Sequence, residues 1–71
     1  MLIEEKLDFI ERVLHAPKYS LEEDTLLNNV EGWESLNIVN LQMELAVHNI
    51  NVEFDELMKC STVGELCLMI D

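Results

Sequence analysis

The stretch from Ser35 to Asn49 constrains the fold most, because its apolar residues lie on two opposite faces of one predicted helix. At about 100° per residue, Ile38, Leu41 and Leu45 share one face. The opposite face carries Leu36, Val39, Met43 and Val47. One face has to pack on a core. The other face either contacts further helices, as in a central helix, or is a docking surface for a partner protein.

A second amphipathic stretch lies at the start of the chain. Its apolar residues recur at helical spacing, at Ile3, Leu7, Ile10 and Leu14. Charged residues occupy the other side of this predicted helix: Glu4, Glu5, Asp8, Glu11 and Arg12. We expect the helix to end near His15–Ala16, because Pro17 disfavours helical geometry in the residue before it.

Two capping boxes, each a serine or threonine followed by a glutamate at the third position after it, predict further helix starts. Ser20 with Glu23 predicts a short helical turn, and Thr62 with Glu65 opens a last helix. The apolar stripe of that last helix is Val63, Leu66, Cys67 and Ile70. Residues 55–59 are long enough for one or two helical turns. The connection before Ser35 carries Leu26, Leu27 and Val30, so we expect it to pack on the core.

These stretches predict an all-α fold: a small four-helix bundle of up-down character, with three main helices, one short helix and a long loop between helices one and two. A chain of 71 residues makes a single domain, 1–71. A domain of this size has little room for a substrate pocket closed to water. We therefore expect a carrier, adaptor or binding module and not an enzyme.

The charge balance narrows the possible partners. Fifteen acidic and four basic side chains give a formal net charge of −11. Nucleic acids and anionic membrane surfaces would be repelled, so neither is expected to bind. Proteins with basic docking patches are the natural partners, because complementary charge steers association. The same charge also keeps a small protein in solution.

The two cysteines, Cys60 and Cys67, are expected to be reduced thiols, with Cys67 acting as a small buried hydrophobe. The N-terminus does not match a secretory signal, and no apolar run reaches membrane-spanning length. We therefore expect a cytoplasmic protein. Asp24, Asn28 and Glu31 lack the spacing and the central glycine of a calcium loop, so no metal site is predicted.

Ser35 is the candidate functional residue, since it stands where a turn-prone segment meets the two-faced helix. Asn28, Asn29 and Gly32 indicate a turn directly before it. A serine at this junction can cap the helix N-terminus. It can also present its hydroxyl to another protein.

The motifs around Ser35 resemble those of the acyl carrier proteins. Gly32-Trp33-Glu34-Ser35-Leu36 is similar to the family's Asp-Ser-Leu triplet at the start of the second helix, often preceded by Gly-Trp. The likeness continues through Val39-Asn40-Leu41, Leu45 and Ile50-x-Val52-x-Phe54 to Thr62-Val63-Gly64-Glu65-Leu66. It covers essentially the whole chain.

The resemblance implies that Ser35 carries 4′-phosphopantetheine, transferred from coenzyme A by a phosphopantetheinyl transferase. The thiol of the arm would hold acyl intermediates as thioesters in fatty acid, polyketide or related specialised biosynthesis. It further implies a free-standing, monomeric carrier that contacts its enzymes through Glu34, Leu36, Val39 and Met43. The arm supplies the reactive group, so no catalytic residue is expected in the chain.

Two features depart from the family pattern. Glu34 replaces the usual aspartate, which keeps the charge but moves the carboxylate and weakens it as a helix cap. Asn37 and Asn40 stand at positions that are often acidic in carriers of fatty acid synthesis. Both features favour a specialised carrier. The alternative is an unmodified helical adaptor that binds partners through the same apolar face, with Ser35 only as the N-cap.

Overall fold

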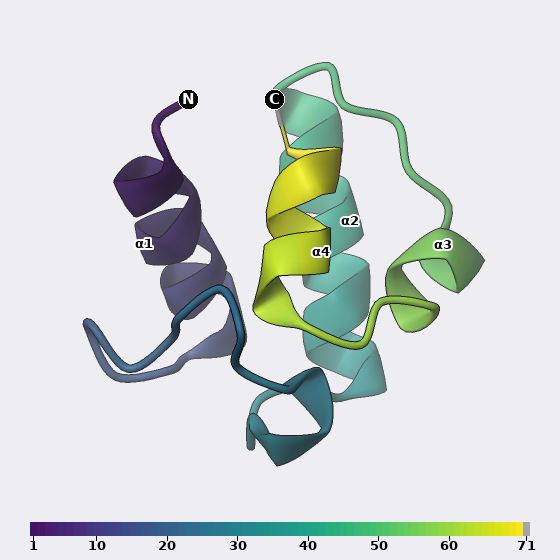
Figure 1. Ribbon diagram of the computed structural model, residues 1–71. Helices are drawn as coiled ribbons and strands as arrows, with labels where there is room; N and C mark the ends of the chain where they lie inside the picture. Colours follow the sequence, from purple (N-terminus) through teal and green to yellow (C-terminus); the bar gives the residue numbers. More distant parts are fainter. Residues whose placement is uncertain (71) are drawn as a thin grey trace.

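The computed structural model describes residues 1–70, and it is all-helical over that range (Figure 1). Its elements are α1 (Ile3–Leu14), the 3-10 turn η1 (Leu27–Asn29), α2 (Ser35–Val47), α3 (Phe54–Met58) and α4 (Val63–Met69). The predicted all-α class is confirmed, with three longer helices and the short α3. The only strand-like feature within residues 1–70 is an isolated antiparallel bridge between Leu26 and Thr62.

The helix ends follow local backbone chemistry. α1 ends at Leu14 because His15 adopts a left-handed conformation, with φ of 58°, just before Pro17. α2 ends at Val47, two residues before the predicted Asn49, which is itself left-handed with φ of 65°. The capping box at the start of α4 is confirmed.

The helical turn predicted from Ser20 and Glu23 is wrong. The hydroxyl of Ser20 donates to the carbonyl oxygen of Pro17, and the N–H of Glu22 donates to Oγ1 of Thr25 at 2.9 Å. These local bonds give the backbone a turn in place of a helix start. The short helical turn of this connection lies further on, at Leu27–Asn29.

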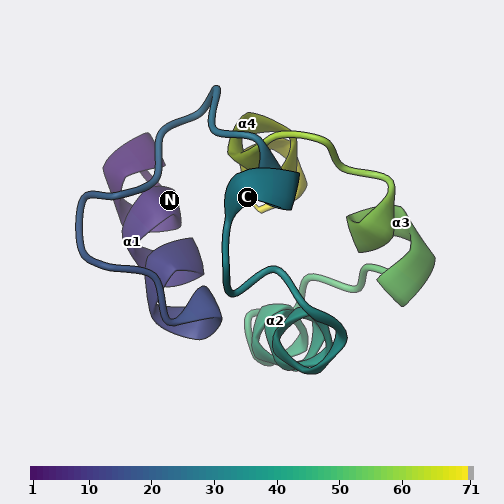
Figure 2. The same ribbon diagram turned by 90° about the horizontal axis from the view of Figure 1, so that it is seen from below.

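α1, α2 and α4 surround the core, and α3 lies at the edge beside α2 (Figures 1 and 2). α1 runs opposite to α2, as an up-down bundle requires. α4 runs in the same sense as α2, because the chain crosses through the short α3 and returns before α4 begins (Figure 1). The up-down character that we predicted is therefore seen between α1 and α2, whereas α2 and α4 run in the same sense (Figure 1).

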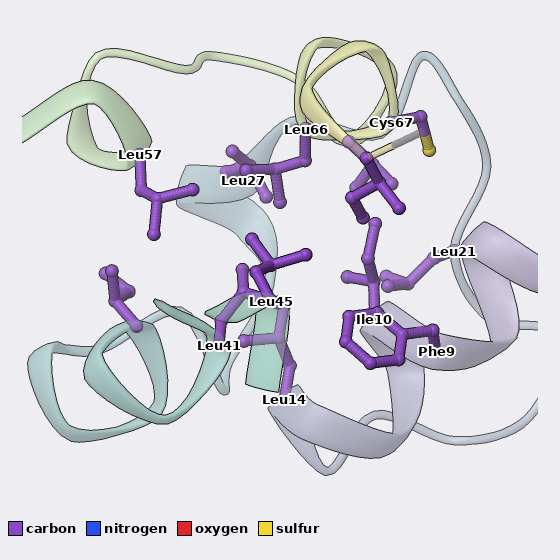
Figure 3. Close-up of a cluster of buried hydrophobic side chains, with 13 residues drawn as sticks. Phe9, Ile10, Leu14, Leu21, Leu27, Leu41, Leu45, Leu57, Leu66 and Cys67 are labelled. Atoms are coloured by element: carbon purple, nitrogen blue, oxygen red, sulfur yellow. The ribbon is translucent and has the colours of Figure 1, made fainter. Parts of the chain in front are cut away.

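The core draws on every helical element (Figure 3). Its side chains are Phe9, Ile10, Leu14, Leu21, Leu27, Ile38, Leu41, Leu45, Leu57, Val63, Leu66, Cys67 and Ile70. Full burial of one leucine or isoleucine contributes about 1.5–3 kcal/mol. The prediction that Ile38, Leu41 and Leu45 face the core is confirmed, and so is the burial of Cys67.

Glu11 corrects our prediction for the outer side of α1. We placed it among the exposed charges, yet it is only 4% exposed. Its carboxylate accepts hydrogen bonds from the backbone N–H groups of Tyr19 and Leu21, each at 3.1 Å. A buried carboxylate thus holds the start of the long connection against α1.

The far half of the connection is fixed to the start of α4. The N–H of Leu27 donates to the carbonyl oxygen of Ser61 at 2.9 Å, and the N–H of Val63 donates to that of Thr25 at 2.9 Å. The N–H of Gly64 donates to the carbonyl oxygen of Glu23 at 2.8 Å. The prediction of a packed loop is confirmed for Leu27 and Val30, but it is wrong for Leu26, which is 51% exposed. This loop positions the turn that leads into α2.

Candidate functional site

The turn before α2 is seated directly on the end of α1. A Cβ added to Gly32 would lie 1.9 Å from the carbonyl oxygen of Leu14, so only glycine allows the two backbones to approach this closely. The N–H of Trp33 donates to Val30, and the N–H of Glu34 donates back to the carbonyl oxygen of Gly32 at 2.9 Å. The packing of α1 therefore fixes where α2 begins.

The side chain of Asn37 completes this turn. It is 8% exposed, and its Nδ2 donates to the carbonyl oxygen of Gly32 at 2.9 Å. The sequence pattern placed Asn37 only on a flank of the helix and gave no sign of this bond. The bond to Gly32 explains why this position carries a neutral amide in place of an acidic side chain.

Ser35 is the first residue of α2 and is exposed. Glu34, not Ser35, occupies the N-cap position, so the reading of Ser35 as N-cap is wrong. The carboxylate of Glu34 makes no capping hydrogen bond. The N–H of Ile38, which donates to the carbonyl oxygen of Glu34 at 2.9 Å, is the first to bond within the helix. The N–H groups of α2 before Ile38 have no partner within the helix and lie at its start, beside Ser35.

The second apolar face of α2 is exposed, as the sequence predicted. Leu36 is 67% exposed, Val39 38% and Met43 62%. No other described helix covers these side chains, so the central-helix interpretation does not hold. Together with Glu34 they form one surface next to Ser35, which we call the α2 surface; its binding of partners stays a prediction.

A polar cavity of about 370 Å³ lies on the other side of Ser35. Ser35 and Trp33 line it from the start of α2, and Lys59, Cys60 and Ser61 line it from the segment after α3. Lys59 brings one of the four basic residues of the chain to this cavity. The sequence could not reveal this pairing, because the two segments lie far apart along the chain.

Neither cysteine is activated as a nucleophile. Burial raises the pKa of the Cys60 thiol, and the charge of Glu65 raises it further. Burial likewise raises the pKa of Cys67; the charge of Lys6 lowers it in part, and the charge of Glu23 adds a further rise. Both thiols are therefore protonated at neutral pH, which removes them as candidates for covalent catalysis.

Over the described residues, no group of three or more His, Cys, Asp or Glu side chains is placed to hold a metal ion. Nor does any helix in residues 1–70 combine the length and the apolar character needed to cross a membrane.

The fold and the site define a small acidic helical domain that presents a serine at the start of its second helix, beside an exposed apolar surface. Residues 7–70 match the family model described as "Phosphopantetheine attachment site". The chain belongs to this family of carrier proteins, which are not enzymes and which bear a 4′-phosphopantetheine prosthetic group. Neither the curated proteins nor the solved structures provide a match.

The residues at the start of α2 fit this group. A phosphodiester is an anion, and uncapped N–H groups at a helix N-terminus favour an anion through both their hydrogen bonds and the helix dipole. The failure of Glu34 to cap the helix leaves those N–H groups available. Ser35 is exposed, so another protein can reach its hydroxyl.

Proposed function

We propose that this protein is a free-standing, monomeric acyl carrier protein that is modified with 4′-phosphopantetheine on Ser35. The observation that carries the proposal is the exposed Ser35 on the uncapped first turn of α2, in a chain of the phosphopantetheine-attachment family. When bound, the arm supplies a terminal thiol that holds an acyl group as a thioester.

In the modification step, the hydroxyl oxygen of Ser35 attacks the phosphorus of coenzyme A that bears the pantetheine. The new O–P bond forms as the phosphoanhydride bond breaks, adenosine 3′,5′-bisphosphate leaves, and the serine proton passes to a base of the transferase. The chain's part is to expose Ser35 at the first position of α2. Free N–H groups beside it stabilise the phosphodiester that results.

The α2 surface is the proposed contact for partner enzymes. Leu36, Val39 and Met43 give it exposed apolar area, which is the kind of side chain that anchors an interface. The formal charge of −11 favours enzymes with basic patches around their active-site entrances. The transferase and the acyl-handling enzymes would therefore use the same surface in turn.

We propose that the protein serves fatty acid, polyketide or related specialised biosynthesis. The acyl group that the arm carries decides which of these pathways it serves. Asn40 is exposed on α2 and uncharged, which favours partners other than those that read an acidic second helix. Asn37 gives no such indication, because it is turned inward to Gly32. Cys60 and Cys67 are free thiols, as suits a reducing cytoplasm.

Holo-conversion tests the attachment site. The protein is incubated with coenzyme A, magnesium and a broad-specificity phosphopantetheinyl transferase, and its intact mass is recorded. We expect one added phosphopantetheine on the wild type and none on Ser35→Ala. Ser61→Ala is the matched control, since Ser61 lines the same polar cavity. A wild type that gains no mass would favour the unmodified adaptor, and a Ser35→Ala variant that is still modified would move the site.

A further inference from the structure

The polar cavity beside Ser35 contains one positively charged side chain. Among the described residues that line it, Lys59 is the only basic one and Glu34 is the only carboxylate. Lys59 is exposed at the C-terminal end of α3, and Ser35 is exposed at the first position of α2. Two elements that are distant along the chain therefore bring a cation and the attachment serine to one cavity of about 370 Å³.

Lys59 differs from the other basic residues in having no charged partner. Each of the other three makes a contact within the chain: Lys6 with the carbonyl oxygen of Cys67, Arg12 with the carboxylate of Asp8, and Lys18 with the ring of Tyr19. Within residues 1–70, no carboxylate forms an ion pair with the ammonium of Lys59. Its charge is therefore not offset by a direct partner in this part of the chain.

The carboxylates nearest to Lys59 on its other side are already engaged. Glu56 and Glu65 line a neighbouring hollow together with Lys59. The carboxylate of Glu56 accepts the N–H of Glu53 at 2.9 Å, and that of Glu65 accepts the N–H of Thr62 at 2.9 Å. These bonds belong to the capping boxes of α3 and α4, which hold both carboxylates at the helix starts. The ammonium of Lys59 is thus available to a further anion.

Attachment of the arm would create such an anion at the cavity. The phosphodiester on Ser35 would lie one residue from Glu34, in a chain whose formal charge is already −11. Like charges this close repel each other, and a cation lining the same cavity offsets that repulsion. A lysine ammonium suits this task, because it is a compact charge on a flexible stem and binds phosphate as a point charge.

We propose that Lys59 binds the phosphodiester of the arm across the polar cavity, and so directs the root of the arm toward α3, which lies beside α2 (Figure 1). This inference rests on the proposed attachment at Ser35. It gives the prosthetic group a binding residue from outside the attachment motif. The free N–H groups of α2 and the ammonium of Lys59 would then contact the phosphate from two elements.

The first test uses the wild type alone. The protein is labelled with ¹³C-lysine, and the Cε signals of Lys6, Lys18 and Lys59 are compared between the apo and holo forms. Attachment should shift the Lys59 signal at least twice as far as either of the others. In 1 M salt, where the screening length is about 3 Å, the Lys59 shift should fall to about half or less. A Lys59 shift no larger than the others, or one that salt leaves unchanged, would overturn the proposal.

The second test follows the phosphate itself by ³¹P NMR of the holo protein. Lys59→Gln should move the phosphorus resonance at least twice as far from its wild-type position as Lys18→Gln does. Both variants remove one positive charge, but Lys18 does not line the polar cavity, so it is the matched control. Lys59→Arg keeps the charge and should stay closer to the wild type than Lys59→Gln. Equal displacements in the two Gln variants would contradict the binding role of Lys59.

The variants should fold, because both lysines are exposed, and circular dichroism checks this. The lysine measurement needs no variant and decides the matter by itself. The two proposals fail separately. A wild type that gains no mass with coenzyme A and the transferase would reject the attachment at Ser35. A holo protein in which neither the Lys59 signal nor the phosphorus resonance behaves as expected would reject this inference alone.

Discussion

The side-chain amide of Asn37 donates a hydrogen bond of 2.9 Å to the carbonyl oxygen of Gly32, and so ties the first turn of α2 to the backbone seated on α1. That carbonyl also accepts the N–H of Glu34 at 2.9 Å. The bond from Asn37 spans Ser35, and the bond from Glu34 closes the turn at Trp33 directly before the helix. The position of Ser35 therefore depends on the side chain of Asn37, which bonds to Gly32.

Replacing Asn37 with alanine should loosen this turn. Because the carbonyl oxygen of Gly32 keeps the bond from Glu34, the free energy of unfolding should fall by only about 1 kcal/mol. The rate of phosphopantetheine transfer to Ser35 should fall as well. Urea unfolding and timed intact-mass measurements check the two effects. Asn40→Ala, exposed on the same helix, should change neither; equal losses in the two variants would contradict the role of the bond.

Replacing Glu11 with glutamine should destabilise the fold more strongly. The two oxygens of Glu11 each accept a backbone N–H, and glutamine offers one oxygen and one NH₂ group, which would face a donor. We expect the free energy of unfolding to fall by about 2 kcal/mol in urea titrations. Glu4→Gln, at an exposed position of α1, should have almost no effect. A Glu11→Gln variant as stable as the wild type would show that the connection does not depend on this carboxylate.

The capping box of α4 predicts a pH dependence. The backbone N–H groups of Ser61 and Thr62 hold the pKa of Glu65 below its ordinary value of 4.5. A depressed pKa in the folded state gives stability that is present above pH 4.5 and lost as the pH falls through the lowered value. Thermal unfolding should therefore show Glu65→Gln less stable than the wild type at neutral pH, with the difference shrinking in acid.

Glu44→Gln serves as the control for that experiment, because Glu44 is exposed in the middle of α2. Its difference from the wild type should stay small over the same pH range. If the difference in thermal stability between Glu65→Gln and the wild type widened in acid, its sign would contradict this mechanism.

A charge on the α2 surface should disrupt partner binding without disrupting the fold. Val39→Glu and Met43→Glu place a carboxylate where an enzyme would bury an apolar contact, so turnover by a partner enzyme should fall by about tenfold or more. Far-UV circular dichroism should not change, since both side chains are exposed. Leu68→Glu, on the exposed side of α4, is the control. Lost helicity in Val39→Glu would instead show that this face is part of the core.

Helical periodicity predicted much of the fold, because burial follows directly from spacing in a helix. The division of α2 into a buried face with Leu41 and an exposed face with Met43 needed no knowledge of other elements. The start of α4 was equally predictable, since Thr62 and Glu65 bond within a single turn. The same pattern failed at Ser20, where a competing bond to Pro17 uses the hydroxyl.

The parts that sequence could not predict depend on contacts between distant segments. The burial of Glu11 follows from N–H groups on a loop whose path no local pattern specifies. The polar cavity at Ser35 likewise needs Lys59, which arrives from the segment after α3. The exposure of Ser35 was within reach of sequence reasoning, and so was the weak capping by Glu34, which makes no capping hydrogen bond in the structure.

The backbone hydrogen bonds between the long connection and α4 also predict that the amide hydrogens of these two segments exchange with solvent together. The amide hydrogens of Leu27, Val63 and Gly64 are each held by a partner in the other segment. None of them can be released by fraying of one helix alone. They should therefore exchange with deuterium only when the whole domain opens, and their common rate would report its global free energy of unfolding.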